Sequence, residues 1–148
     1  MARSPYSTLP DALKRSIHFV ALAVLLTGIA WLALHFAPNG WIDEARSLHL
    51  QTESLKLHGA AAMLSLIAIG TLLIAHILPG LKNPQNRAAG ILLLACAAIL
   101  ALTGWGLYYL GDEDLRSWTS NVHIAIGVAA AIAFIWHVRY RKRCARVD

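Results

Sequence analysis

Four long apolar runs, separated by polar connections, dominate the pattern of hydrophobic and polar positions along this chain of 148 residues. The runs cover roughly residues 16–37, 57–78, 88–110 and 122–138. Each reaches or approaches the ~20 residues that an α-helix needs to cross the hydrocarbon core of a bilayer. Inside lipid such segments must be helical, because every backbone N–H and C=O group needs an internal partner. The pattern predicts an all-α membrane protein whose four transmembrane helices form a bundle.

The polar connections carry residues that break or start helices. The Pro-Asn-Gly sequence at 38–40 ends the first run, and the Pro-Gly sequence at 79–80 ends the second. Between these breaks, Trp41–Lys56 is amphipathic. This segment predicts either a short helix on the outer membrane surface or an extension of the second span. In the last connection, Thr119 or Ser120 is expected to cap the final helix.

Composition agrees with the membrane prediction. Hydrophobic residues make up 57% of the chain and charged residues 14%, whereas about 25% of the residues of a typical soluble protein are charged. A chain of this length forms one modest domain, so we expect a single transmembrane domain over residues 1–148. Cys96 lies in the middle of the third run and is expected to be a small core residue.

The charged residues alternate in sign from one connection to the next. The basic side chains gather near both chain ends and in the middle connection: Lys14, Arg15, Lys82, Arg87, Arg139, Arg141, Lys142, Arg143 and Arg146. The acidic side chains gather in the other two connections: Asp43, Glu44, Glu53, Asp112, Glu113 and Asp114. Because basic loops stay on the cytoplasmic side of a membrane, both termini are expected there. Anionic membrane lipid explains the net charge of +5, so nucleic acid is not an expected partner.

Six of the seven histidines lie within or beside the apolar runs, and His49 lies in the first connection. An imidazole is costly to place in hydrocarbon, so a histidine there is a functional candidate. By depth, His58 and His123 belong to the outer side, and His18, His76 and His137 belong to the inner side. The remaining two, His35 and His49, are given no role.

Two flat haem groups at different depths would account for this distribution. A low-spin b-type haem takes an axial nitrogen on each face, supplied by facing helices. His123 and His137 are 14 residues apart. On a helix this spacing gives about 21 Å of rise, and the two positions lie within about 40° of each other around the helix axis. His58 and His123 form the outer pair. The inner haem has His137 with either His18 or His76. If the second run supplied both partners, His58 and His76, their spacing along the helix would differ from that of His123 and His137 by about 6 Å in rise. A partner from the first run avoids this mismatch, which favours His18.

Further residues could complete these sites. His76 could be an alternative inner ligand, a contact to a quinone or haem propionate, or an ordinary interfacial histidine. Gly127 could let a porphyrin approach the helix backbone, or could serve helix packing. Four cations could pair with propionates, although they could equally set the topology: Arg139 and Arg141 inside, and Lys56 or Arg116 outside.

The sequence H-F-V-A-x5-T-G, which begins at His18, resembles the first helix of bacterial cytochrome b561-type proteins. That family includes the membrane cytochrome subunits of formate dehydrogenase and hydrogenase, and superoxide oxidase. The spacing His123-x13-His137 resembles the family's two-ligand helix, and His58 and the LTGWGLYY end of the third run also fit. Phe19 stands where the family usually has tryptophan. The resemblance covers all four runs.

The resemblance implies that His18 and His137 ligate the inner haem iron and that His58 and His123 ligate the outer one. It also implies an oxidoreductase function in electron transport. The expected role is a dihaem b-type cytochrome that carries electrons between the quinone pool and a periplasmic cytochrome, another redox protein or a larger dehydrogenase. Two alternatives remain: a superoxide:quinone oxidoreductase on the same scaffold, and a non-redox membrane assembly or transport module without a cofactor.

Overall fold

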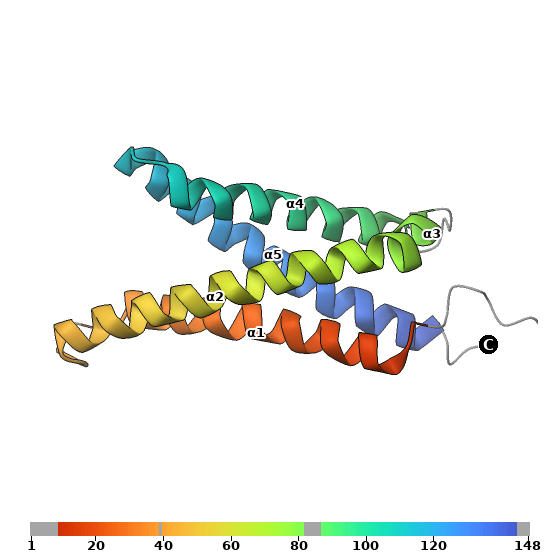
Figure 1. Ribbon diagram of the computed structural model, residues 1–148, viewed down its shortest axis with the longest axis horizontal. Coiled ribbons are helices and arrows are strands. Elements are labelled where there is room, and N and C mark those ends of the chain that lie inside the picture. The colour runs from red at the N-terminus through yellow and green to blue at the C-terminus, as the bar shows by residue number, and fades with distance from the viewer. Residues whose placement is uncertain (1–8, 39, 82–86, 145–148) are drawn as a thin grey trace, which may run out of the picture. The chain divides into compact units, whose positions relative to one another are not determined.

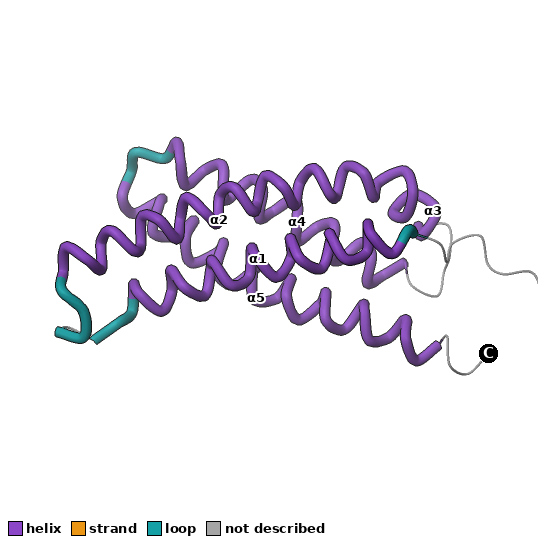
Figure 2. Tube along the Cα trace, turned by 60° about the horizontal axis from the view of Figure 1, so that its bottom comes forward, coloured by secondary structure: helices purple, strands orange, loops and turns teal. Residues whose placement is uncertain are grey.

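A computed structural model describes residues 9–38, 40–81 and 87–144 (Figure 1). In this described part every regular element is a helix, which confirms the all-α prediction (Figure 2). Four helices are long and apolar enough to cross a membrane. They are α1 (Asp11–His35), α2 (Glu44–Leu72), α4 (Arg87–Tyr109) and α5 (Glu113–Cys144).

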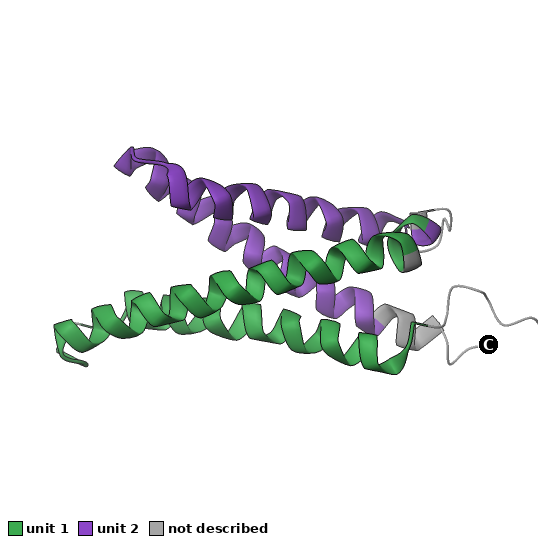
Figure 3. Ribbon diagram, in the orientation of Figure 1, with its two compact units in different colours: residues 1–78 green, residues 79–148 purple. Residues whose placement is uncertain are grey.

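The chain divides into two compact units, which Figure 3 colours separately. The first ends at Leu78 and contains the hairpin of α1 and α2. The second begins at Pro79 and contains the hairpin of α4 and α5. The expectation that the four helices form one bundle in a single domain stays a prediction.

A tight turn and a side-chain cap define the first hairpin. The backbone N–H of Trp41 donates to the Pro38 carbonyl at 3.2 Å. Gly40 adopts a φ of 84°, a value that glycine accepts without steric cost. Asp43 then caps α2 by accepting a hydrogen bond from the Arg46 backbone N–H at 3.3 Å. Because α2 runs without a break from Glu44, the amphipathic segment before the second run is an extension of that span.

The second hairpin turns at an aspartate as well. The Asp112 carboxylate accepts a hydrogen bond from the Leu115 backbone N–H at 2.8 Å, at the first turn of α5. The expectation that Thr119 or Ser120 caps this helix is therefore wrong, since both lie within it. The Thr119 hydroxyl instead donates to the Leu115 carbonyl at 2.7 Å. Because this aspartate caps the helix before the apolar run begins, α5 starts earlier than the apolar run alone predicts.

The end of α2 contains a π-helical turn, η1, over Leu73–Ile77, followed by the short helix α3 over Leu78–Leu81. The backbone N–H of Leu78 bonds the carbonyl five residues back, at Leu73. Pro79 gives a physical reason, because its ring conflicts with the carbonyl four residues earlier in a regular helix. The helix therefore continues past the Pro-Gly sequence, which does not end it as the sequence pattern predicted.

Small residues occupy the most buried positions of the hairpins. Among the described side chains, those classed as buried are Ala61 of α2, Cys96 of α4 and Ala133 of α5. Small side chains allow neighbouring membrane helices to approach closely. The burial of Cys96 confirms its predicted place in the core. Large apolar side chains such as Phe19 and Ile74 remain exposed, as expected of helices that contact lipid.

Candidate functional site

In the first hairpin, Thr27 of α1 contacts His58 of α2. The Nδ1 atom of His58 lies 3.1 Å from Thr27 Oγ1 and 3.1 Å from the Val24 carbonyl oxygen. A carbonyl oxygen only accepts hydrogen bonds, so Nδ1 is the donor. The Thr27 hydroxyl donates its own proton to the Ala23 carbonyl at 2.7 Å, so its oxygen also accepts from His58. These bonds assign the ring proton to Nδ1 and the lone pair to Nε2.

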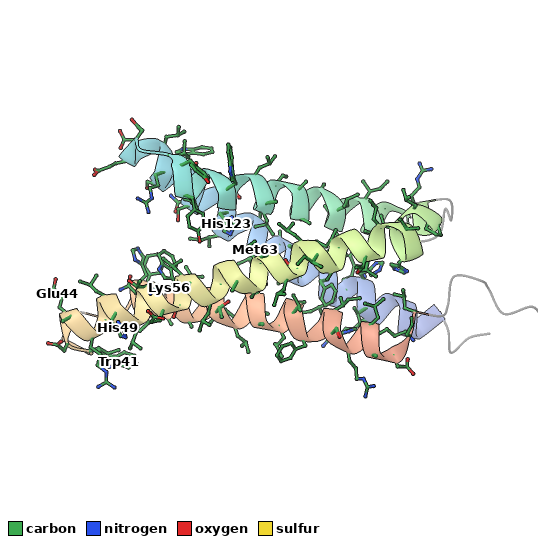
Figure 4. All side chains as sticks on the ribbon, in the orientation of Figure 1. Trp41, Glu44, His49, Lys56, Met63 and His123 are labelled. Atoms are coloured by element: carbon green, nitrogen blue, oxygen red, sulfur yellow. The ribbon has the colours of Figure 1, made fainter. Side chains whose placement is uncertain are left out.

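The second hairpin repeats this contact with different residues. Thr103 Oγ1 on α4 lies 2.8 Å from Nδ1 of His123 on α5, which Figure 4 labels. The Thr103 hydroxyl donates to the Ile99 carbonyl at 2.7 Å, so it too accepts from the imidazole. The ring of His123 therefore carries its proton on Nδ1 and its lone pair on Nε2, as His58 does.

A glycine follows the threonine in each hairpin and faces the same imidazole. A Cβ atom built on Gly28 would lie 3.3 Å from Cε1 of His58. A Cβ atom on Gly104 would lie 3.4 Å from Cε1 of His123. Both distances are tighter than ordinary contacts, so a larger residue would push the ring away. Each Thr-Gly pair thus provides an oxygen acceptor and the room for the ring beside it.

His18 has a similar bond within its own helix. Its Nδ1 atom lies 2.6 Å from the Lys14 carbonyl oxygen, one turn earlier in α1. Because that oxygen only accepts, this ring also carries its proton on Nδ1. The Lys14 ammonium pairs with the Asp11 carboxylate at 2.9 Å. His18 itself is exposed and borders an open surface hollow that Arg15 also lines.

His123 and His137 lie on one uninterrupted α-helix, α5. The regular geometry behind the estimates of about 21 Å of rise and about 40° of rotation is therefore present. Both side chains are partly buried. Between them, a Cβ atom on Gly127 would meet the Leu100 side chain of α4 at 3.9 Å. That distance supports a role of Gly127 in helix packing, and its approach to a porphyrin stays a prediction.

His76 lies inside the π-helical turn η1. A π-helix takes more residues per turn than an α-helix. Regular α-helical spacing would place His58 and His76 on one helix face, and the π turn changes that spacing at His76. Single π turns inside α-helices often mark functional positions. The structure therefore gives His76 an unusual backbone setting and leaves its ligand and quinone roles as predictions.

The cations expected near haem propionates differ in their surroundings. Lys56, labelled in Figure 4, pairs with Glu53 at 2.7 Å. Arg116 and Arg139 are exposed. The backbone of Arg141 lies in α5, but its side chain is outside the described residues. Of these four side chains, Lys56 already has a carboxylate partner that a propionate would have to replace.

No family model matches the chain, and neither does any curated protein or solved structure. The resemblance to b561-type cytochromes therefore rests on the residues of the chain alone. Within the described ranges, no group of three His, Cys, Asp or Glu side chains could hold a metal ion. Axial ligation of a haem is a different arrangement, which takes one side chain on each face.

The bonds at Nδ1 of these histidines fit axial haem ligation through Nε2. A metal-bound imidazole almost always donates its other ring N–H to a carbonyl or another acceptor. His18 and His58 make this donation from Nδ1 to a carbonyl oxygen, and Nδ1 of His123 lies 2.8 Å from Thr103 Oγ1. Thr27 and Thr103 were not predicted as partners of these rings. The signal was the Thr-Gly pair shared by the first and third runs.

Proposed function

We propose that this chain is a dihaem b-type membrane cytochrome that carries electrons across a membrane. The observation that carries the proposal is the repeated support of His58 and His123 by Thr-Gly pairs, with each Nδ1 as a donor. This support gives each ring an Nε2 lone pair, the form in which a neutral imidazole binds iron. A haem held by such nitrogens supplies a low-spin, one-electron redox centre.

Each proposed ligand has a defined role. His58 and His123 hold the outer haem, and His18 and His137 hold the inner haem. The assignment into pairs follows from the depth of each histidine in its apolar run and from the b561 resemblance. Because His123 and His137 share α5, this one helix fixes the separation of its two ligand positions at about 21 Å. The helix thereby keeps two redox centres at separate depths.

The proposal extends to the surroundings of the protein. The alternation of basic and acidic connections supports both termini in the cytoplasm and anionic lipid beside the basic tail. The resemblance to bacterial b561-type proteins supplies the bacterial inner membrane. The resemblance supplies quinone as one electron partner and a periplasmic redox protein, or a larger dehydrogenase, as the other. Acidic residues in the outer connections would attract a basic soluble cytochrome by complementary charge.

Substitution of His123 tests the proposed ligands. We expect His123→Ala to lose the outer haem and to keep the inner one, because His18 and His137 are unchanged. The haem content would fall from two per chain to one, measured by pyridine haemochrome absorbance. His49→Ala is the matched control, since His49 is an exposed histidine with no proposed role. Retention of both haems in the His123→Ala protein would contradict the assignment.

The superoxide:quinone alternative uses the same haem ligands and differs in the electron donor. Stopped-flow measurement of superoxide decay, with purified protein and a soluble quinone, separates the two. Superoxide decay that is faster and depends on quinone would support the oxidoreductase. Unchanged superoxide decay would support a protein that only relays electrons. The alternative of a module without cofactor predicts no haem bands at all in a reduced-minus-oxidised spectrum.

A further inference from the structure

We propose that Thr27 and Thr103 are a matched pair of positioning residues that set the donor strength of the outer haem's two axial imidazoles. The proposal rests on the proposed function for the haem, and on the described contacts for the threonines. Each threonine lies on the first helix of its hairpin and bonds the histidine of the second helix. The outer haem would thus have a threonine behind each of its ligands.

In both hairpins the threonine hydroxyl has a carbonyl of its own helix to which it can donate. Thr27 donates to the Ala23 carbonyl, and Thr103 donates to the Ile99 carbonyl, both at 2.7 Å. A hydroxyl has one proton, so these helical bonds leave only its oxygen lone pairs for a histidine. A hydroxyl that could rotate would accept either ring tautomer. With its proton on the helical carbonyl, the threonine hydroxyl favours an imidazole that presents N–H, which is the Nδ1–H tautomer.

This bond affects the metal-binding nitrogen on the other side of the ring. When Nδ1–H donates to an oxygen, the imidazole gains electron density and Nε2 becomes a stronger base. A stronger donor stabilises ferric iron more than ferrous iron, so it lowers the reduction potential of the haem. Loss of the threonine oxygen should therefore raise the potential. It should also weaken haem binding, by roughly tenfold or more, as loss of a hydrogen-bond partner of a metal ligand usually does.

The two threonines should not contribute equally. His58 also donates to the Val24 carbonyl at 3.1 Å, so its ring keeps an acceptor when the Thr27 oxygen is removed. Its bond to Thr27 is also longer, at 3.1 Å, than the bond of 2.8 Å between Thr103 and His123. Because the bond to Thr103 is the shorter of the two, we expect the larger shift in potential from Thr103.

The test compares valine and serine at both positions. Thr27→Val and Thr103→Val keep the side-chain shape and remove the hydroxyl, whereas Thr27→Ser and Thr103→Ser keep the oxygen. Thr71→Val and Thr119→Val are the controls, because each hydroxyl makes the same kind of helical bond, to Ala68 or Leu115, in a described contact without histidine. A spectroelectrochemical titration of the purified haem protein measures both midpoint potentials.

The expected result is a rise in one of the two midpoint potentials in each valine variant, larger for Thr103→Val. The serine variants should restore the original value, and the control variants should leave both potentials unchanged. Equal potentials in valine, serine and wild-type proteins would overturn the proposal. A purely structural role would change protein yield or melting temperature without moving one potential selectively.

A second measurement works without haem, so it separates this proposal from the proposed function. In the purified apoprotein labelled with 15N-histidine, ring nitrogen shifts distinguish the Nδ1–H tautomer from the Nε2–H tautomer. We expect His123 as Nδ1–H in the wild type and a mixture of tautomers in Thr103→Val. A wild-type His123 in the Nε2–H form overturns the role of threonine. If the chain binds no haem but His123 is Nδ1–H, the proposed function fails and the tautomer selection stands.

Discussion

The two hairpins, α1 with α2 and α4 with α5, contain the same contact between a Thr-Gly pair and a histidine. The contact lies at a different distance from the turn in each hairpin. In both, a Thr-Gly pair on the first helix meets the imidazole of the second helix, and an aspartate caps that second helix. His58 comes 14 positions after Glu44, whereas His123 comes 10 positions after Glu113. The first hairpin thus extends about one helical turn, or about 6 Å, further beyond its histidine. The contact with histidine is kept while the length of the hairpin varies.

The hairpins differ more at their other ends. In the first, the second proposed ligand is His18, on the same helix as the Thr-Gly pair. In the second, it is His137, on the same helix as His123. His18 bonds the Lys14 carbonyl of its own helix at 2.6 Å. The two proposed outer ligands therefore share one kind of contact across a hairpin, and the two proposed inner ligands lie on α1 and α5.

The largest expected effect tests whether the hairpins contribute to the same haem. His58→Ala should remove the same haem as His123→Ala, because an axial pair needs both imidazoles. The two variants should show one remaining haem with the same absorption bands and the same midpoint potential. If the remaining haems differ, His58 and His123 belong to different sites and the pairing is wrong.

A smaller effect is expected at the glycines. Gly28→Ala and Gly104→Ala place a methyl group 3.3 and 3.4 Å from the histidine rings, so each imidazole must shift by a few tenths of an ångström. We expect weaker haem retention, by roughly tenfold at most, measured by transfer of haem to apomyoglobin. Gly70→Ala is the control, because a Cβ atom there meets nothing within 4 Å. Equal haem retention in all three variants would show that the rings do not depend on the glycines.

The smallest effect is expected at the two aspartate caps. Asp112→Ala and Asp43→Ala should each lower the free energy of unfolding by about 1 kcal/mol, the usual value of an N-cap. The bond at Asp112 is shorter, 2.8 Å against 3.3 Å at Asp43, so its loss should cost more. Chemical denaturation in detergent, followed by circular dichroism, measures both. A larger loss at Asp43 would contradict the ranking of the turns.

The sequence predicted the helices well because lipid leaves an apolar chain few other structures. It did not decide whether the segment before Lys56 was a separate helix, since an amphipathic pattern fits both choices. It placed the cap of α5 at Thr119 or Ser120 because the apolar run suggested a later start. In the structure the helix begins at Glu113, because Asp112 caps it and its first turns are polar.

The sequence pointed to the histidines of the candidate site but not to the threonines that contact them. Depth and helical spacing identify His58 and His123 from single runs of sequence. The contact between Thr103 and His123 joins two helices, and spacing within one run cannot show which side chains meet across a hairpin. The π turn around His76 was missed for another reason: a proline predicts a disturbance and not its form.

The central claim is that the chain binds two haems, and haem stoichiometry tests it most directly. Full-length protein, purified in detergent from cells supplied with a haem precursor, is assayed by pyridine haemochrome absorbance against protein concentration from amino-acid analysis. We predict two b-type haems per chain. A preparation that is folded and helical but contains no haem, or saturates at one per chain, would contradict the account.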